Sequence, residues 1–383
     1  MIMKDKLINV SFIVVIFVLA ALARIALLPL ESGDYYNYLS VWMGRIQEVG
    51  PWDSLSMTIS NYSSAYMYIM CLLSGFSNSM LALKLASVAF DFVAAGVMFL
   101  LLHHLTGSKR KGVAAMAITL LCPTVIFNSA WWCQCDIIYC TFMLLSLLFL
   151  LKDKGSLCCI MLGLAFAFKV QAVFLLPFLV IMWLKGRTIK FWQFLWIPAI
   201  YFVIQIPAWI AGRPLSELMG VYFLQAGEFP FGTMHFPNIY DFLDETVARW
   251  HHMKEIGSFG LYFSLGVLGI FAYWMYSVKF RMTNEILVTM ALFSVCLVLF
   301  TMPHMHERYG FFVDLLAIVY AIQRPEKLLI SLGYVVISII TYAFFLTGTC
   351  FIPTLPLAFA MLALNVCVGM DLARQIRDNA LEE

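Results

Sequence analysis

A single carboxylate, Asp34, stands close to the point where a long apolar run of the sequence ends. Residues 8–30 are almost entirely apolar, and Tyr35, Tyr38 and Trp42 follow Asp34 closely. A carboxylate in such a place can take the proton of a substrate hydroxyl during attack. It can equally cap the helix that follows, because aspartate is common at helix N-caps. Both interpretations, a catalytic site at a membrane boundary and a helix cap, fit these residues.

Further polar residues that could do chemistry come in short groups between apolar stretches. They are Gln134 and Asp136 in WWCQCD, Lys169 and Gln171 in FKVQA, and His304, His306, Glu307 and Arg308 in PHMHERY. Structural explanations also exist, since Asp136 can cap the next helix and His306, Glu307 and Arg308 can form an ion pair at the membrane surface. The ten cysteines lie mostly in apolar runs without a CxxC pair or histidine-spaced ligands, so neither a metal site nor a disulfide is predicted.

Composition indicates which solvent surrounds most of the chain. Of its 383 residues, 63% are hydrophobic and 12% are charged, and the mean hydropathy is +0.89. Soluble domains carry about 25% charged residues, and a single water-soluble core stops growing at a few hundred residues. We therefore expect a membrane protein. Its net charge of +2 indicates no partner by itself, and no nucleic-acid partner is expected.

Apolar runs predict about twelve membrane-spanning helices. A bilayer-crossing helix needs about 20 apolar residues, or fewer where other protein covers it. The predicted spans are 8–30, 79–105, 113–131, 137–151, 156–169, 171–184, 190–211, 258–278, 285–302, 309–322, 327–348 and 352–371. The first run is too long for the apolar part of a signal peptide, about 7–15 residues, so we expect it to be retained. The predicted fold class is an all-α polytopic membrane protein.

Basic residues orient these spans. With the N-terminus in the cytoplasm, sixteen of the 24 Lys and Arg residues fall in cytoplasmic loops or termini. This asymmetry is what the positive-inside rule requires. Both termini are therefore predicted to be cytoplasmic, and residues 31–78 and 212–257 become the long outer loops.

The predicted outer face holds the candidate residues, whereas charges well inside the spans are few. They are Lys84, Asp91 and Asp314. Lys84 and Asp91 are seven residues apart, so they share a helix face and can pair through a neighbour. A transporter needs polar residues along a path to both faces. The asymmetry therefore favours a catalytic pocket on one side of the membrane.

The first outer loop has a helical pattern of its own. Apolar and aromatic residues recur at spacings of three and four after Asp34, at Tyr35, Tyr38, Leu39, Trp42 and Ile46. This spacing predicts an amphipathic helix, and Tyr62, Tyr66 and Ile69 repeat it. Because Tyr and Trp favour the headgroup layer, both helices could simply rest on the membrane.

Several of these stretches resemble motifs of the GT-C glycosyltransferases that use polyprenyl-phosphate sugars. GDYYNYLSVWMGRI resembles their first-loop signature, closest to dolichyl-phosphate-glucose glucosyltransferases and their bacterial relatives. WWCQCD resembles the W-G-Q-x-D of bacterial proteins related to GPI mannosyltransferases, FKVQAVFLLP their F-K-P-Q-A segment, and HMHERY their H-x-H-E-K/R. The matches keep the family's order over residues 33–309. Two departures exist: NYSSAYMY lacks the family's aspartate and prolines, and FKVQ lacks its proline.

The resemblance implies a single GT-C-like domain over residues 1–383 and an inverting hexosyl transfer at the extracytoplasmic face. A polyprenyl-phosphate sugar would be the donor, and a glycan or lipid-linked molecule the acceptor. Asp34 would be the general base. A guanidinium suits the phosphate that leaves, so Arg308 would bind it with His306 and Lys169. The residues expected to contact substrates are Tyr35, Trp42, Tyr62, Gln134, Asp136, Gln171, His304 and Glu307. No cofactor or metal is required, although some GT-C members use a divalent metal.

Two other functions remain open at this point. A transporter or flippase for a lipid-linked glycan also needs many spans, but the hydropathy shows no inverted repeat. A polysaccharide polymerase or ligase would use a pyrophosphate-linked donor and favours two arginines, whereas Arg45 and Arg213 are less well placed than Arg308. The short loops and the lack of an ER-retrieval signal indicate a bacterial plasma membrane.

Overall fold

The computed structural model describes residues 2–225, 232–243 and 253–381, and the side chains of 11–225, 232–243 and 257–381. The described part is almost entirely helical, which confirms the all-α prediction. The chain divides into two compact units, which are treated separately here. The first unit comprises residues 1–152, 157–170 and 195–222, and the second comprises 153–156, 171–194 and 223–383. That both act as one domain stays a prediction.

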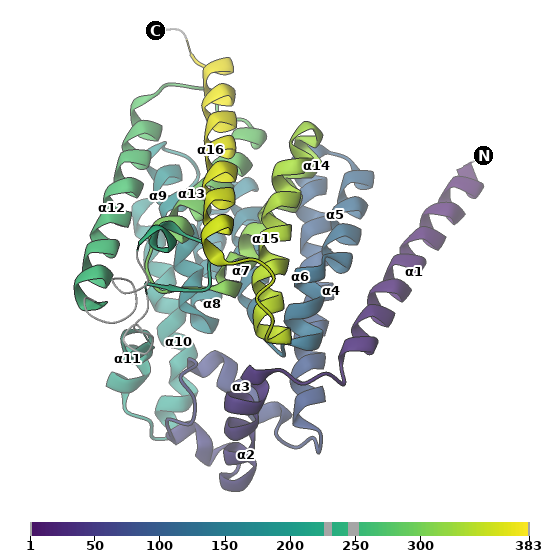
Figure 1. The fold of residues 1–383 in the computed structure, drawn as a ribbon, viewed down its shortest axis with the longest axis vertical. Helices are drawn as coiled ribbons and strands as arrows, with labels where there is room; N and C mark the ends of the chain where they lie inside the picture. Colours follow the sequence, from purple (N-terminus) through teal and green to yellow (C-terminus); the bar gives the residue numbers. More distant parts are fainter. Residues whose placement is uncertain (1, 226–231, 244–252, 382–383) are drawn as a thin grey trace. The chain divides into compact units, whose positions relative to one another are not determined.

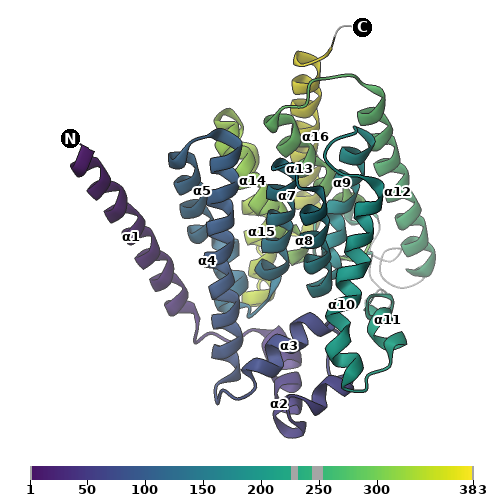
Figure 2. The same cartoon turned by 180° about the vertical axis from the view of Figure 1, so that it is seen from behind.

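The first unit is built around the long helix α4, which packs against α5 and α7 (Figures 1 and 2). The helices α2 and α3 contact each other and α4. The helical elements of this unit are α1 (Ile2–Leu27), η1 (Tyr35–Leu39), α2 (Ser40–Val49), η2 (Asp53–Ser56), α3 (Ser64–Leu73), α4 (Ser79–Thr106), α5 (Lys109–Leu121), α6 (Pro123–Ile126), η3 (Phe127–Trp131), α7 (Asp136–Leu151), most of α8 (Gly155–Phe168), α10 (Trp196–Ile210) and most of α11 (Leu215–Gln225).

In the second unit α13 packs against α12, α14 and α16, and α15 packs against α14 and α16. A two-stranded parallel sheet joins β1 (Thr233–Met234) to β2 (Met305–His306). The helical elements are most of η4 (Val170–Leu175), α9 (Leu176–Leu184), η5 (Phe191–Leu195), η6 (Ile239–Phe242), α12 (Met253–Ser277), α13 (Asn284–Thr301), η8 (Glu307–Gly310), α14 (Phe311–Gln323), η9 (Pro325–Lys327), α15 (Leu328–Thr347) and α16 (Thr354–Asp378). Within the predicted outer loop 212–257, residues 226–231 and 244–252 lie outside the described part.

Each of the twelve predicted spans coincides with a helical segment. Among the described residues, six helices are long and apolar enough to cross a membrane, and a bent pair makes a seventh. The six are Ser79–Thr106, Phe191–Ile210, Gly257–Ser277, Asn284–Thr301, Pro325–Thr347 and Thr354–Asp378. The other apolar helices, counted over the residues whose side chains are described, have 10–17 residues each, and α1 is counted there from Ser11 to Leu27. The protein is thus an integral membrane protein, and the full count of twelve spans stays a prediction.

The bent pair replaces the continuous span predicted for residues 113–131. Helix α5 ends at Leu121, Cys122 is extended, and Pro123 opens α6, so the helix axis turns by 51°. A residue before proline is pushed out of the helical region by contact with the proline ring. The chain then makes a π-helical turn, Phe127–Trp131, before the loop that contains Gln134. The break therefore aims the 132–136 loop away from the line of α5.

Charges inside the first unit are paired, but not as predicted for Lys84 and Asp91. The Arg24 guanidinium donates to Asp91 at 2.7 Å, and both side chains are fully buried. Ser129 donates to the same carboxylate at 2.6 Å. Lys84 instead donates to the backbone carbonyls of Leu28 and Leu30. The predicted pairing of Lys84 with Asp91 through a neighbour is wrong, because α1 supplies Arg24 to Asp91 and the chain that follows α1 supplies carbonyls to Lys84.

Substitution of Arg24 tests how much the buried Arg24–Asp91 pair contributes to the free energy of unfolding. Arg24→Met leaves the Asp91 carboxylate buried without its guanidinium, which typically costs about 3–5 kcal/mol. We expect a correspondingly lower free energy of unfolding in detergent. Arg45→Met is the matched control, because the Arg45–Glu48 pair is half exposed or more on both sides and such pairs contribute little. Equal stability of the two variants would contradict the assignment.

Candidate active site

Asp34 directly precedes a helix that matches the predicted amphipathic one. The π-helical turn η1 continues into α2, so residues 35–49 are helical. The buried face differs from the prediction: Leu39, Met43 and Ile46 are buried, whereas Tyr38 is 44% exposed. Asp34 makes no side-chain capping hydrogen bond to this helix. The helix-cap interpretation of Asp34 is therefore wrong.

The Asp34 carboxylate is instead held by two N–H donors from the 132–136 loop. The Trp132 indole donates to Oδ2 at 3.0 Å, and the Gln134 side-chain amide donates to the same oxygen at 2.6 Å. Trp132 is 1% exposed, so its ring is a rigid support. Asp34 itself is only partly buried. The contacts join residues about 100 positions apart in the sequence and orient the carboxylate.

The loop that carries these donors has an unusual bend at Cys133, whose φ of +64° lies in the left-handed region. Glycine adopts this conformation readily and other residues rarely do, and the resembling W-G-Q-x-D motif has glycine here. Ser32 donates to the Trp132 carbonyl at 2.7 Å and accepts from the Tyr35 backbone N–H. These bonds tie the bend to the chain on either side of Asp34. Burial raises the pKa of the Cys133 thiol to about 12, so the thiol stays neutral.

Asp136 and Lys169 form a buried ion pair beside this loop. The Lys169 ammonium is 2.6 Å from Asp136 Oδ1, and the two side chains are 7% and 1% exposed. The Asn128 amide donates to the other carboxylate oxygen at 2.9 Å. Asp136 lies in the first turn of α7, where the helix dipole favours an anion. The structure therefore engages Asp136 chiefly with Lys169 and Asn128.

Aromatic rings connect α2 to this cluster. The ring centroids of Tyr38 and Trp42 are 5.9 Å apart, those of Trp42 and Tyr62 are 5.6 Å apart, and those of Tyr62 and Tyr66 are 5.0 Å apart. The Tyr62 hydroxyl donates to Gln134 Oε1 at 3.3 Å. Lys169 lies 5.2 Å from the centre of the Tyr62 ring, within range of a cation–π contact. Trp42 and Tyr62, both predicted from the sequence, thus belong to one cluster with Gln134.

The second unit contains the other predicted group, from PHMHERY. Glu307 is 1% exposed and accepts from Arg308 at 3.1 Å, with the His306 ring nitrogen 3.6 Å away. Burial alone would raise the pKa of Glu307, but the contact with His306 and the charge of Arg308 outweigh it and hold the pKa below its ordinary value. The ion-pair alternative is thus observed.

The remaining predicted residues are placed as follows. His304 has a left-handed φ of +62°, and its backbone N–H donates to the Gly232 carbonyl. Gln171 is buried in η4 of the second unit. Of the two arginines weighed for a second phosphate, Arg45 binds Glu48 on the surface, and Arg213 is buried 3.7 Å from Glu217. Tyr35 is half-buried, and burial raises its pKa.

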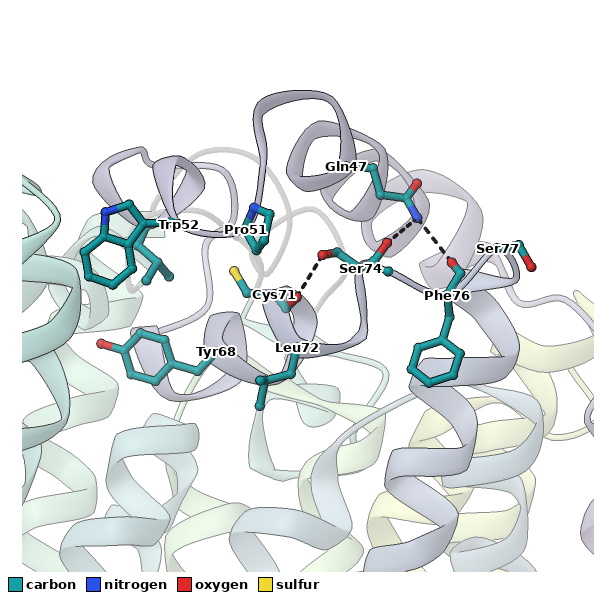
Figure 3. A pocket seen from close by; sticks show the side chains of 11 residues that line it. Gln47, Pro51, Trp52, Tyr68, Cys71, Leu72, Ser74, Phe76 and Ser77 are labelled. Carbon is teal, nitrogen blue, oxygen red and sulfur yellow. Dashed lines mark hydrogen bonds between the residues drawn. The ribbon is translucent and has the colours of Figure 1, made fainter.

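An open groove of about 940 Å³ lies elsewhere in the first unit, between the end of α2 and α3. Figure 3 shows Trp52 and Tyr68 on one side of it and Gln47 on the other. The Gln47 amide donates to the carbonyls of Ser74 and Phe76. No predicted site residue lines this groove. It is therefore separate from the contacts of Asp34.

Two clusters thus emerge from the predicted residues. The first unit unites Asp34, Tyr62, Gln134, Asp136 and Lys169 through side-chain contacts. The second unit unites His306, Glu307 and Arg308. Trp132, Asn128 and Ser32 were not predicted as site residues. Trp132 belongs to the WWCQCD motif, whereas no sequence pattern points to Asn128 or Ser32. Within the described residues, no three His, Cys, Asp or Glu side chains are grouped closely enough to hold a metal ion.

No protein-family model matches the sequence, and no curated protein sequence matches it significantly. Among solved structures, the chain is similar to the crystal structure of ArnT from Cupriavidus metallidurans bound to undecaprenyl phosphate. The TM-score is 0.57 with 14% sequence identity, over 95% of this chain and 78% of ArnT. Likeness at this identity shows the fold alone. The chain therefore shares the fold of ArnT, as the resemblance of its motifs led us to expect.

The lowered pKa of Glu307 predicts a pH-dependent stability. A carboxyl whose folded pKa is depressed stabilises the fold above its unfolded pKa and loses that contribution as the pH falls through the folded value. Wild type should therefore exceed Glu307→Gln in unfolding free energy by about 1–3 kcal/mol at neutral pH, and the gap should shrink below the ordinary pKa of 4.5. Unfolding in detergent measures this. Glu48→Gln, at an exposed pair, should show no such gap. A gap that is constant with pH would refute the assignment.

Proposed function

We propose that this protein is a membrane glycosyltransferase that moves a hexose from a polyprenyl-phosphate donor to a glycan or lipid-linked acceptor, with inversion. The observation that carries the proposal is the Asp34 carboxylate, held by the N–H groups of Trp132 and Gln134 at the start of the helix that η1 and α2 form. Support also comes from the fold, which resembles that of ArnT bound to undecaprenyl phosphate. We place the reaction at the extracytoplasmic face of a bacterial plasma membrane, with both termini cytoplasmic.

Chemistry assigns Asp34 the role of general base. The leaving group of such a donor is a phosphate, which is a stable anion and needs no general acid. The acceptor hydroxyl is weakly acidic, so its attack gains from a carboxylate that takes the proton in the transition state. Two donors on one carboxylate oxygen fix the plane of Asp34. A fixed base in contact with the acceptor lowers the entropic part of the barrier.

The departing phosphate needs positive charge and hydrogen-bond donors, and we assign these to Arg308 with His306. A guanidinium has five N–H donors in a planar fork and can donate to two phosphate oxygens at once. Glu307 would then orient the guanidinium. Tyr35, Trp42 and Tyr62 are proposed to contact the sugar or the prenyl chain, and no step here requires a metal.

Asp34→Asn tests the base directly. The amide is nearly isosteric but cannot accept a proton at neutral pH, so kcat should fall by about 10²–10⁴-fold. The measurement is transfer from a synthetic polyprenyl-phosphate hexose by purified protein. Asp53→Asn, an exposed carboxylate of the same loop, is the matched control and should retain wild-type activity. Near-normal transfer by Asp34→Asn would reject Asp34 as base.

Arg308→Ala tests the phosphate contact. Loss of a charge-assisted hydrogen bond costs about 1.5–3 kcal/mol, which corresponds to a rise in the donor KM of about 10–100-fold. The variant should first be shown to unfold at a temperature near that of wild type, because Glu307 keeps only His306 as an ionic partner in the described part. Arg45→Ala serves as the surface control. An unchanged donor KM in a folded Arg308→Ala protein would remove Arg308 from the phosphate site.

A further inference from the structure

The Lys169–Asp136 ion pair is connected to Gln134 by two separate routes. Along the first route, the Asn128 amide donates to Asp136 Oδ2 at 2.9 Å. The Asn128 backbone carbonyl in turn accepts from the Gln134 backbone N–H at 2.9 Å. Asn128 is fully buried. One rigid residue therefore binds both the ion pair and the main chain of Gln134.

The second route runs through Tyr62. Lys169 Nζ lies 5.2 Å from the centre of the Tyr62 ring. The Tyr62 hydroxyl donates to Gln134 Oε1 at 3.3 Å. The same lysine is 2.6 Å from Asp136. The two routes close a ring of contacts that holds both the backbone and the side chain of Gln134.

The ring of contacts determines which end of the Gln134 amide meets Asp34. An ionised carboxylate only accepts hydrogen bonds, so the NH₂ end must face it. The Tyr62 hydroxyl, by donating to the carbonyl end, favours that orientation over the flipped one. Displacement of a catalytic group by about 1 Å can cost a large part of the rate. Movement of the Gln134 side chain would therefore change the orientation of the Asp34 carboxylate.

We infer that Lys169 and Asp136 are positioning residues for Asp34, acting through Asn128, Tyr62 and Gln134; this inference rests on the proposed function. Lys169 is accordingly removed from the donor phosphate site. Its ammonium is a compact charge that is buried and already in contact with Asp136. Turning it toward a phosphate would leave the Asp136 carboxylate buried without its counter-charge, which is strongly unfavourable.

The closing experiment separates kcat from the donor KM in the transfer assay. Lys169→Met and Asp136→Asn should each lower kcat about 10–100-fold while the donor KM stays within about twofold of wild type. Gln134→Met removes the direct hydrogen-bond donor to Asp34. The loss of kcat that it causes is the reference for the losses in the ion-pair variants. Because the pair acts through Gln134, Asp136→Asn should lower kcat no further in the Gln134→Met background.

Tyr62→Phe keeps the experiment decisive if the ion-pair variants fail to fold. It removes only the hydroxyl that orients Gln134 and keeps the ring beside Lys169. We expect an unchanged melting temperature, an unchanged donor KM and a kcat about 3–10-fold lower. Asp371→Asn is the matched control for Asp136→Asn, because it neutralises a similarly buried, ion-paired carboxylate of the second unit. The kcat of Asp371→Asn should stay at the wild-type value.

Four outcomes would overturn the inference. A donor KM raised tenfold or more by Lys169→Met, with kcat unchanged, would return Lys169 to the phosphate site. Fully additive losses of kcat for Asp136→Asn and Gln134→Met, or a kcat of Tyr62→Phe equal to wild type, would show that Gln134 does not transmit the effect. If wild type transfers no hexose from the polyprenyl phosphate, the proposed function itself fails, and the inference fails with it.

Discussion

A charge buried in this protein must meet a counter-charge or, like Lys84, backbone carbonyls, because neither lipid nor the packed interior can solvate it. Arg24 and Asp91, Lys169 and Asp136, and Glu307 and Arg308 each meet within one unit. The first two pairs join segments that are far apart in the sequence, whereas Glu307 and Arg308 are neighbours in η8. The polar interior thereby determines which segments must lie together, while the apolar surfaces of the helices leave many packings possible.

The segment from Pro123 to Asp136 shows how this constraint produces a site. Proline breaks the helix, the π-helical turn delivers Ser129 to the Arg24–Asp91 pair, and Asn128 reaches the Lys169–Asp136 pair. Between these anchors the loop has little freedom. The N–H groups of Trp132 and Gln134 in this loop consequently reach the carboxylate of Asp34, which follows α1. The same few residues thus satisfy buried charges and hold the carboxylate that we propose as the general base.

Much of the fold could be predicted because hydrophobic periodicity and charge asymmetry are local signals. All twelve predicted segments are helical, and the helix after Asp34 begins where the spacing of aromatic residues indicated. Polar partners were harder to predict. Nothing in the sequence links Asp136 to Lys169, 33 residues later, or Arg24 to Asp91, because these contacts arise only when the helices pack. The contact of Asn128 with Asp136 could not be predicted for the same reason, because residues 113–131 were predicted as one uninterrupted span.

Cys133 illustrates how a backbone shape can persist without the residue that normally makes it. At a φ of +64°, cysteine has a conformational penalty of about 1–2 kcal/mol that glycine would avoid. The buried thiol, 1% exposed, offsets part of this penalty through its van der Waals contacts. Chains that share this bend should therefore tolerate different small side chains there, and a sequence search that demands glycine at this place would overlook proteins like this one.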